Sequence, residues 1–300
     1  MQRIFTFGIA ATAAALSCSV SARAASTAYA SAVMADSPYL YYRLGETTGT
    51  AAADASGNGR NGTYVNVPSA NLGKAGSKAS GDTAATFNGS NAYLASPAAA
   101  SGFGAAIGTS SYELVFKVNS GFSVTAATTS IFGVAANKTQ TNGTNLTAVS
   151  FSLNQTATGV TNTSTTAPTA VAFFRDQAGN SVRAAFSELT LTDGNYHDLI
   201  ITYGGARNIG IYVDGVNLAF TPSGAGGSGT YYSDMNPYFA GSNGRGTASG
   251  FAPITLDEAS IYTGILTQDS IATHAAAAVP EPAVLGVIGI GCVLSLRRRR

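Results

Sequence analysis

Short hydrophobic runs separated by turn-forming residues fill the middle of the chain. The clearest run, Tyr112–Val118, alternates large hydrophobic residues with Glu113, Val115 and Lys117. Such alternation is typical of a strand that buries one face and exposes the other. Further strands are expected at Tyr39–Leu44, Ser130–Val134, Ala148–Leu153, Val171–Arg175, Val182–Phe186, Tyr196–Tyr203, Gly210–Val213, Val216–Phe220, Tyr238–Gly241 and Ile254–Tyr262. Many short strands of this kind predict an all-β sandwich or barrel rather than a parallel sheet.

Local signals place a hairpin and two short flanking helices. Asp214-Gly215, between two hydrophobic runs, tolerates the positive φ angles of a type I′ turn and predicts a two-residue hairpin. Residues 29–35 predict a helix that Asp36-Ser37-Pro38 ends. Near the other end, Thr267 can cap a helix over Gln268–Ala276.

Residues 1–24 have the layout of a secretory signal peptide. A positive start at Arg3 is followed by the hydrophobic run Ile4–Val20 and the small-residue site Ala22-Arg23-Ala24. We expect this segment to be removed after Ala24 and the body of the chain to be exported. A buried N-terminal helix is the alternative.

The C-terminal segment, residues 279–300, is built differently. Pro280-Glu281-Pro282 precedes a hydrophobic stretch, Ala283–Leu296, and four arginines. Fourteen helical residues reach about 21 Å, which is short for a hydrocarbon core of about 30 Å. The arginines should stay cytoplasmic, so that the body faces outward.

This tail resembles the PEP-CTERM sorting signal of Gram-negative bacteria. The resemblance rests on Pro280, Glu281 and Pro282, the short hydrophobic helix and the terminal arginine cluster. It implies recognition by an exosortase, cleavage near the motif, and delivery from a transient inner-membrane anchor to the cell surface or extracellular matrix. An ordinary single-span anchor is the alternative.

Charge and cysteine content exclude several classes of protein. Charged residues make up 10% of the chain. Six of the 16 basic residues and one of the 15 acidic residues lie in the two terminal segments, which leaves 10 basic against 14 acidic residues in the remainder. A nucleic-acid partner is therefore not expected. Both cysteines, Cys18 and Cys292, are also terminal, so the body holds neither a disulfide framework nor a cysteine-based zinc site.

Between the termini, residues 28–278 resemble a laminin-G-like jelly roll of the concanavalin type. The matching blocks occur in the order of that family: Tyr41–Glu46, Ala53–Gly59, Phe87–Tyr93, Tyr112–Lys117, Leu191–Tyr203, Ile211–Gly215 and Ile254–Tyr262. The sequence departs at Tyr42 and Tyr196, where the family usually has tryptophan. The resemblance implies an all-β, antiparallel, two-sheet jelly-roll sandwich over residues 25–278 that binds carbohydrate or protein without catalysis.

An enzyme with this fold is not expected from the sequence. Glycoside hydrolases usually place two carboxylates across the scissile bond. No glutamate here is followed two residues later by aspartate, and Asp257 and Glu258 should point to opposite faces of a strand. His197 and His274 lie far apart in the sequence, and a structural role is expected for His197. An atypical glycosidase remains an alternative.

Calcium is the metal that the sequence suggests. Ca²⁺ prefers carboxylate, amide and carbonyl oxygens from loops rich in Gly and Asn. Asp54 opens such a loop, and the resemblance implies that a structural Ca²⁺ bridges this loop to an aspartate on the last long strand, here Asp257. The alternative is that Asp54 starts an Asx turn and Asp257 binds loop amides.

These features predict an exported surface or matrix protein with a non-catalytic binding module. Its partners would be an extracellular polysaccharide or a surface protein, with Tyr231, Tyr232 and Tyr238 as candidate stacking residues or, equally, core residues. A structural matrix or biofilm protein without a specific ligand is the second hypothesis.

Overall fold

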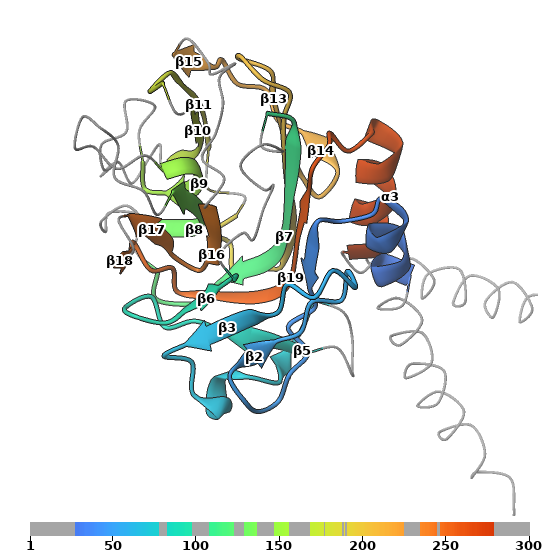
Figure 1. Cartoon of the computed structure of the whole chain (residues 1–300), viewed down its shortest axis with the longest axis vertical. Coiled ribbons are helices and arrows are strands. Elements are labelled where there is room, and N and C mark those ends of the chain that lie inside the picture. Colours follow the sequence, from blue (N-terminus) through green and yellow to red (C-terminus); the bar gives the residue numbers. More distant parts are fainter. Residues whose placement is uncertain are drawn as a thin grey trace, which may run out of the picture.

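Two antiparallel β-sheets lie face to face, and short helices cover the outer side of one of them (Figure 1). This computed structural model describes residues 28–77, 83–97, 108–122, 129–136, 147–155, 169–176, 178–187, 189, 191–224, 235–244 and 247–278. The expected all-β sandwich is confirmed. The predicted signal peptide and sorting tail lie outside the described residues.

The first sheet, called sheet I, has eight strands in the described part of the chain. Along it the order is β14 (Val216–Asn217), β13 (Ile209–Val213), β12 (His197–Tyr203), β7 (Ser110–Val118), β19 (Ile254–Tyr262), β5 (Thr83–Thr86) and β4 (Lys74–Ala75). The short strand β1 (Leu40–Tyr42) pairs with the C-terminal half of β19. Strands from both ends of the sequence therefore meet at the centre of this sheet.

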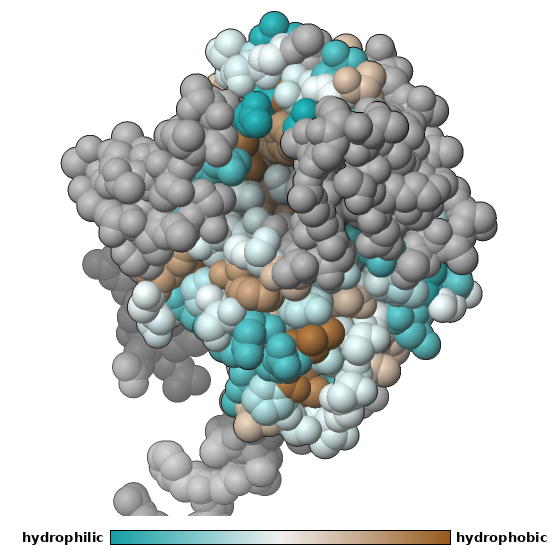
Figure 2. Space-filling model, turned by 60° about the vertical axis from the view of Figure 1, so that its left-hand side comes forward, coloured by the Kyte–Doolittle hydropathy of each residue, from teal (hydrophilic) through white to brown (hydrophobic). Residues whose placement is uncertain are grey.

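The second sheet, called sheet II, has nine described strands. Their order is β15 (Ser223–Gly224), β11 (Ser181–Ser187), β10 (Thr169–Arg175), β9 (Thr147–Leu153), β8 (Thr129–Ala136), β16 (Met235–Phe239), β6 (Tyr93–Ala95), β3 (Gly62–Val65) and β2 (Ala51–Ala52). A small hairpin, β17 (Ser242–Gly244) with β18 (Thr247–Ser249), forms a separate two-stranded sheet. Figure 2 brings the sheet II side forward and shows a hollow with hydrophobic residues on its floor and hydrophilic ones at its rim.

Local turn chemistry acts as the sequence predicts. Asp214 and Gly215 both have positive φ angles, 52° and 77°, and join β13 to β14 in the expected two-residue hairpin. Thr267 caps the N-terminus of helix α3 (Gln268–Ala278), because its side-chain oxygen accepts a hydrogen bond from the backbone N–H of Ser270 at 3.1 Å. A one-turn 3-10 helix, η1 (Ser69–Asn71), precedes β4.

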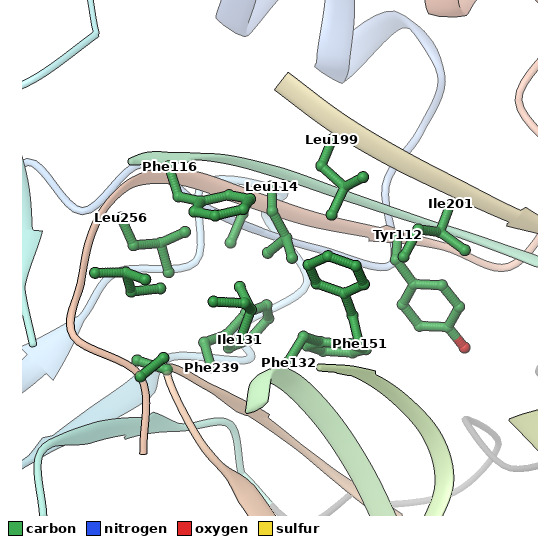
Figure 3. Close-up of a cluster of buried hydrophobic side chains, with 14 of the residues drawn as sticks. Tyr112, Leu114, Phe116, Ile131, Phe132, Phe151, Leu199, Ile201, Phe239 and Leu256 are labelled. Atoms are coloured by element: carbon green, nitrogen blue, oxygen red, sulfur yellow. The ribbon is translucent and has the colours of Figure 1, made fainter. Parts of the chain in front are cut away.

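The main core lies between the two sheets. Figure 3 shows Leu114 and Phe116 of β7 pointing toward Phe132 of β8 and Phe151 of β9. At one end of this layer the rings of Phe174 and Tyr203 stack with centroids 4.1 Å apart. Burying each large hydrophobic side chain of this kind contributes about 1.5–3 kcal/mol, so this layer supplies most of the driving force for folding.

A second hydrophobic layer covers the outer face of sheet I. Residues 28–35 form the N-terminal helix, which lies beside α3 on this face (Figure 1). Tyr29 and Ile271 of the two helices pack on Val115 of β7 and Ile200 of β12. The strand predicted over Tyr112–Val118 is present, but the prediction that it is half-buried is wrong. Val115 is fully buried because the helices cover the face that the alternation assigned to solvent.

Glu113 lies beneath these helices and is completely buried. Its carboxylate accepts hydrogen bonds from the hydroxyls of Tyr29, at 2.9 Å, and Tyr262, at 2.7 Å. The Ser260 hydroxyl donates to it at 3.0 Å. Burial, reinforced by the charge of Glu113, raises the pKa of Tyr29 and Tyr262 well above its usual value, so both phenols remain donors.

His274 of α3 completes this network. Its Nδ1 lies 3.0 Å from a Glu113 oxygen, and its Nε2 lies 3.0 Å from Asp36, just after the N-terminal helix. Burial alone would raise the pKa of Glu113 and lower that of His274. Their mutual contact outweighs burial, so the pKa of Glu113 is lowered and that of His274 is raised. The pair is therefore charged and ties both helices to sheet I.

A β-bulge in β19 changes the expected geometry of two acidic residues. Leu256 pairs with Phe116 and Glu258 with Val115, which leaves Asp257 as the extra residue. Leu256 and Ala259 both belong to the inner core. Asp257 and Glu258, the two residues between Leu256 and Ala259, therefore both point toward the outer face of sheet I. The expectation that they point to opposite faces is wrong.

The sequence predicts a membrane helix near the C-terminus. Among the described helices, none has the length and hydrophobicity that crossing a bilayer requires. The predicted membrane helix at Ala283–Leu296 lies outside the described residues, as do Pro280, Glu281 and Pro282. It stays a prediction of the sequence.

The charged pair predicts a pH-dependent stability. His274 has a raised folded-state pKa, so its stabilisation is complete below about pH 6.5 and is lost as the pH rises through the raised value. Glu113 contributes above about pH 4.5 and loses its contribution as the pH falls through its lowered value. Urea unfolding of His274→Gln should show a loss of about 3 kcal/mol at pH 5.5 and a clearly smaller loss at pH 9.

Ala272→Gln, at an exposed position of the same helix, serves as the matched control and should change stability little at either pH. An equal loss for His274→Gln at pH 5.5 and pH 9 would contradict the charged pair.

Candidate binding site

An open cavity of about 770 Å³ lies on the outer face of sheet I, beyond the part that the helices cover. Its described lining comes from the ends of four strands and from two loops: Lys74, Ala75, Thr86, Lys117, Val118, Asn119, Ser120, Gly121, Phe122, Thr192, Asp193, Gly194 and Thr255. Polar side chains predominate in this lining, and Phe122 adds an aromatic ring.

Strand register builds the floor of the cavity. Lys117 of β7 pairs with Thr255 of β19, which pairs in turn with Thr86 of β5. The chain neighbours of all three point into the inner core, so their own side chains point outward. The Thr86 and Thr255 hydroxyls lie 3.0 Å apart, and Thr255 donates to the Asn119 side-chain oxygen at 2.7 Å. These bonds fix the polar floor on a rigid sheet.

Residues 75–77, called the strap, form one wall. The Tyr196 hydroxyl donates to the Ala75 carbonyl at 2.7 Å, and the Ser77 backbone N–H donates to Asp257 at 2.8 Å. The Ser77 hydroxyl also donates to the carbonyl of Ala278 at 3.3 Å. The strap therefore lies between the cavity, which Ala75 lines, and the C-terminal end of α3.

His197 fixes the opposite wall. Its Nε2 lies 2.9 Å from Asp193, which lines the cavity, and its Nδ1 lies 2.8 Å from Asp214 in the hairpin turn. Burial would lower the pKa of His197, but the two carboxylates outweigh it and raise that pKa. His197 thus bridges the loop to the hairpin, which confirms the structural role expected for it.

Hydrogen bonds from the protein also occupy both carboxylate oxygens of Asp193. Its Oδ1 accepts from the backbone N–H of Asn195 at 2.8 Å as well as from His197, and its Oδ2 accepts from the Asn195 side chain at 2.8 Å. Burial opposes ionisation, yet these donors lower the pKa of Asp193. Asp193 is therefore ionised, and its charge is directed toward the protein.

Asp54, the first predicted calcium ligand, lies in the loop between β2 and β3. Its Oδ1 accepts hydrogen bonds from the backbone N–H of Tyr41 and from the N–H and hydroxyl of Ser56, and its Oδ2 accepts from the N–H of Arg60 at 2.8 Å. Four donors occupy about as many lone-pair positions as a carboxylate has. This arrangement is an Asx turn rather than a cation coordination shell.

Asp257, the second predicted ligand, is buried in the β19 bulge and accepts the backbone N–H of Ser77 in the strap. Within the described ranges, no group of three or more His, Cys, Asp or Glu side chains is arranged to hold a metal ion. Calcium binding by Asp54 and Asp257 with loop carbonyls stays a prediction of the sequence.

The candidate stacking residues have different positions. Tyr238 is half-buried on β16, and its ring stacks on Tyr93 with centroids 5.4 Å apart. Tyr231 and Tyr232 lie outside the described residues. None of the three belongs to the described lining of the cavity.

Sequence reasoning missed the cavity residues. Lys117 was assigned to the outer face of a strand, but nothing local connects it with Lys74 or Thr255, which are 43 and 138 positions away. One signal was available: an outward-facing lysine two residues before a polar turn, Asn119-Ser120-Gly121, marks a strand end that carries charge.

Comparison with known proteins places the fold. No family model matches the chain, and no curated protein matches it. The binding domain of botulinum neurotoxin DC, solved with rat synaptotagmin II, has a TM-score of 0.54 and 13% identity over 81% of this chain and 52% of that one. The serotype D binding domain has a TM-score of 0.52 and 11% identity over 80% and 51%.

An enzyme structure gives a similar match. Trypanosoma rangeli sialidase, in complex with 2,3-difluorosialic acid, has a TM-score of 0.50 and 13% identity over 80% of this chain and 32% of its own. This chain thus spans about half or less of the proteins it matches. At these identities the likeness establishes a shared β-sandwich fold.

The Asx turn leads to a prediction that separates it from a calcium site. Asp54→Ala removes four accepted hydrogen bonds and should lower the free energy of unfolding by about 2 kcal/mol. The loss, measured by urea unfolding, should be the same in EDTA and in millimolar Ca²⁺. A loss confined to the calcium buffer, or a melting temperature of the unaltered protein that rises with Ca²⁺, would instead establish the metal site.

Proposed function

We propose that this chain is an exported, non-catalytic surface or matrix protein whose β-sandwich binds carbohydrate in the cavity on sheet I. The cavity itself carries this proposal. Its volume of about 770 Å³ falls within the range of small-molecule sites, and its hydroxyl and amide groups are held in place by hydrogen bonds. A saccharide presents many hydroxyls and is matched by such a surface.

The nature of the similar structures supports a binding role. One structure of the botulinum neurotoxin DC binding domain holds SialylT and another holds rat synaptotagmin II. Binding domains that contain this β-sandwich have therefore been solved with a protein receptor and with SialylT. Carbohydrate is favoured over protein here because the described lining is concave and mostly polar.

A non-catalytic role is supported by the carboxylates. Asp193 is the one acid in the described lining, and both of its oxygens accept hydrogen bonds from His197 and Asn195. Glycoside hydrolysis usually requires two carboxylates flanking the bond. An atypical glycosidase would have to use a carboxylate from elsewhere, and turnover that one carboxylate substitution abolishes would favour it.

Export and sorting form the second half of the proposal. The signal peptide at residues 1–24 and the tail with Pro280, Glu281 and Pro282 support transport to the surface, by way of an exosortase, in a Gram-negative-type bacterium. The jelly-roll assignment of laminin-G type, from the sequence blocks, agrees with the two-sheet sandwich. A structural matrix protein without a specific ligand is the outcome if no glycan binds.

Obstructing the cavity tests the binding function. Ser120→Trp places a large ring in an exposed turn of the lining, whereas Thr221→Trp places the same ring at an exposed position outside it. On a polysaccharide array that includes the matrix of the producing cells, we expect Ser120→Trp to weaken binding at least tenfold and Thr221→Trp to leave it unchanged. Binding that both variants retain would place the site elsewhere.

Replacing Pro280, Glu281 and Pro282 by alanine tests the sorting function. The unaltered protein should appear at the surface as a form that mass spectrometry finds truncated near residue 280, and the variant should remain full-length in the membrane fraction. Full-length protein at the surface in both cases would indicate an ordinary anchor.

A further inference from the structure

We infer that the cavity on sheet I selects acidic saccharides, those whose sugar rings carry carboxylate groups, through Lys74 and Lys117. This inference rests on the proposed function and names the class of ligand. Two of the four lysines in the chain line this one cavity. Among the described residues, neither forms an ion pair with a carboxylate of the protein.

The geometry of Lys117 supports this role. Its Nζ lies 4.9 Å from the centroid of the Tyr196 ring, which attracts a cation through its π face. The hydroxyl of Tyr196 is bonded to the Ala75 carbonyl, so the ring is fixed at both ends of its side chain. The ammonium is therefore positioned by an uncharged partner, and its charge is available to a ligand.

Hydrogen bonds within the protein occupy the Asp193 carboxylate and the side-chain oxygen of Asn119. Asp193 directs both oxygens to Asn195 and His197. Because Thr255 gives its only hydroxyl proton to the Asn119 oxygen, the close Thr86 hydroxyl must donate to Thr255. The acceptor end of Asn119 is thus occupied. Both threonine hydroxyls can then only accept from a ligand, whereas the Asn119 NH2 group and the ammonium groups of Lys74 and Lys117 donate. The two positive charges complement a negatively charged ligand.

The charge balance of the cavity lining is opposite to that of the rest of the chain outside the terminal segments. Outside the terminal segments, acidic residues outnumber basic ones by 14 to 10, so a general attraction to polyanions is not expected. In the described lining the balance is reversed, with two lysines against one aspartate whose charge His197 offsets. Recognition should therefore be local, and added salt should weaken it by screening.

The experiment compares two forms of one polymer. Isothermal titration calorimetry measures binding of an oligogalacturonide of about six residues, and of the same oligomer after its carboxylates are reduced to alcohols. We expect the acidic form to bind at least tenfold more tightly at low salt. The Lys74→Gln/Lys117→Gln variant should lose about tenfold in affinity for the acidic form and leave the reduced form unaffected.

Controls separate the possible failures. Arg207→Gln removes one cation beyond the far end of β12 and should leave affinity unchanged. Equal binding of the acidic and reduced oligomers would overturn the acidic-saccharide inference and leave the proposed function intact. Binding of polyglutamate as tight as that of the oligogalacturonide would also overturn it, since any polyanion would then suffice. Binding of neither oligomer, nor of any array glycan, would overturn both proposals.

Discussion

A carboxylate buried between a sheet and two helices needs partners for its charge, and Glu113 has them from every element around it. Tyr29 comes from the N-terminal helix, His274 from α3, and Tyr262 from β19. Removing one partner would leave an uncompensated buried charge, which costs several kcal/mol. This network therefore fixes where the helices lie on sheet I. The cavity opens in the part of the same face that the helices leave uncovered.

The bulge in β19 links this layer to the cavity. The extra residue, Asp257, is buried and bonded to Ser77 of the strap, while its neighbour Glu258 lies on the same outer side of the strand. The strap in turn is held by Tyr196 and by the last carbonyl of α3. Through this irregularity in strand pairing, Asp257 holds the strap in place as one wall of the cavity by accepting its backbone N–H.

The cavity combines a rigid floor with walls tied down by charge. The floor belongs to three adjacent strands, and the walls are the strap and the loop that His197 holds to the hairpin turn. Binding surfaces supported by a sheet lose little conformational freedom when a ligand is bound. The two lysines provide a positive charge that an otherwise acidic body lacks. These properties together favour a binding module for acidic sugars over an enzyme.

Local chemistry allowed the sequence by itself to determine much of the fold. Hydrophobic runs between turn-forming residues placed most of the long strands, Asp214-Gly215 specified its hairpin, and Thr267 specified the start of α3, because each signal acts within a few residues. The tertiary structure alone decided that Val115 and Glu113 are covered, that Asp257 is an extra residue in its strand, and that Lys74 meets Lys117 in one cavity. These outcomes depend on which distant strands pair and in which register, and no short stretch of sequence contains that information.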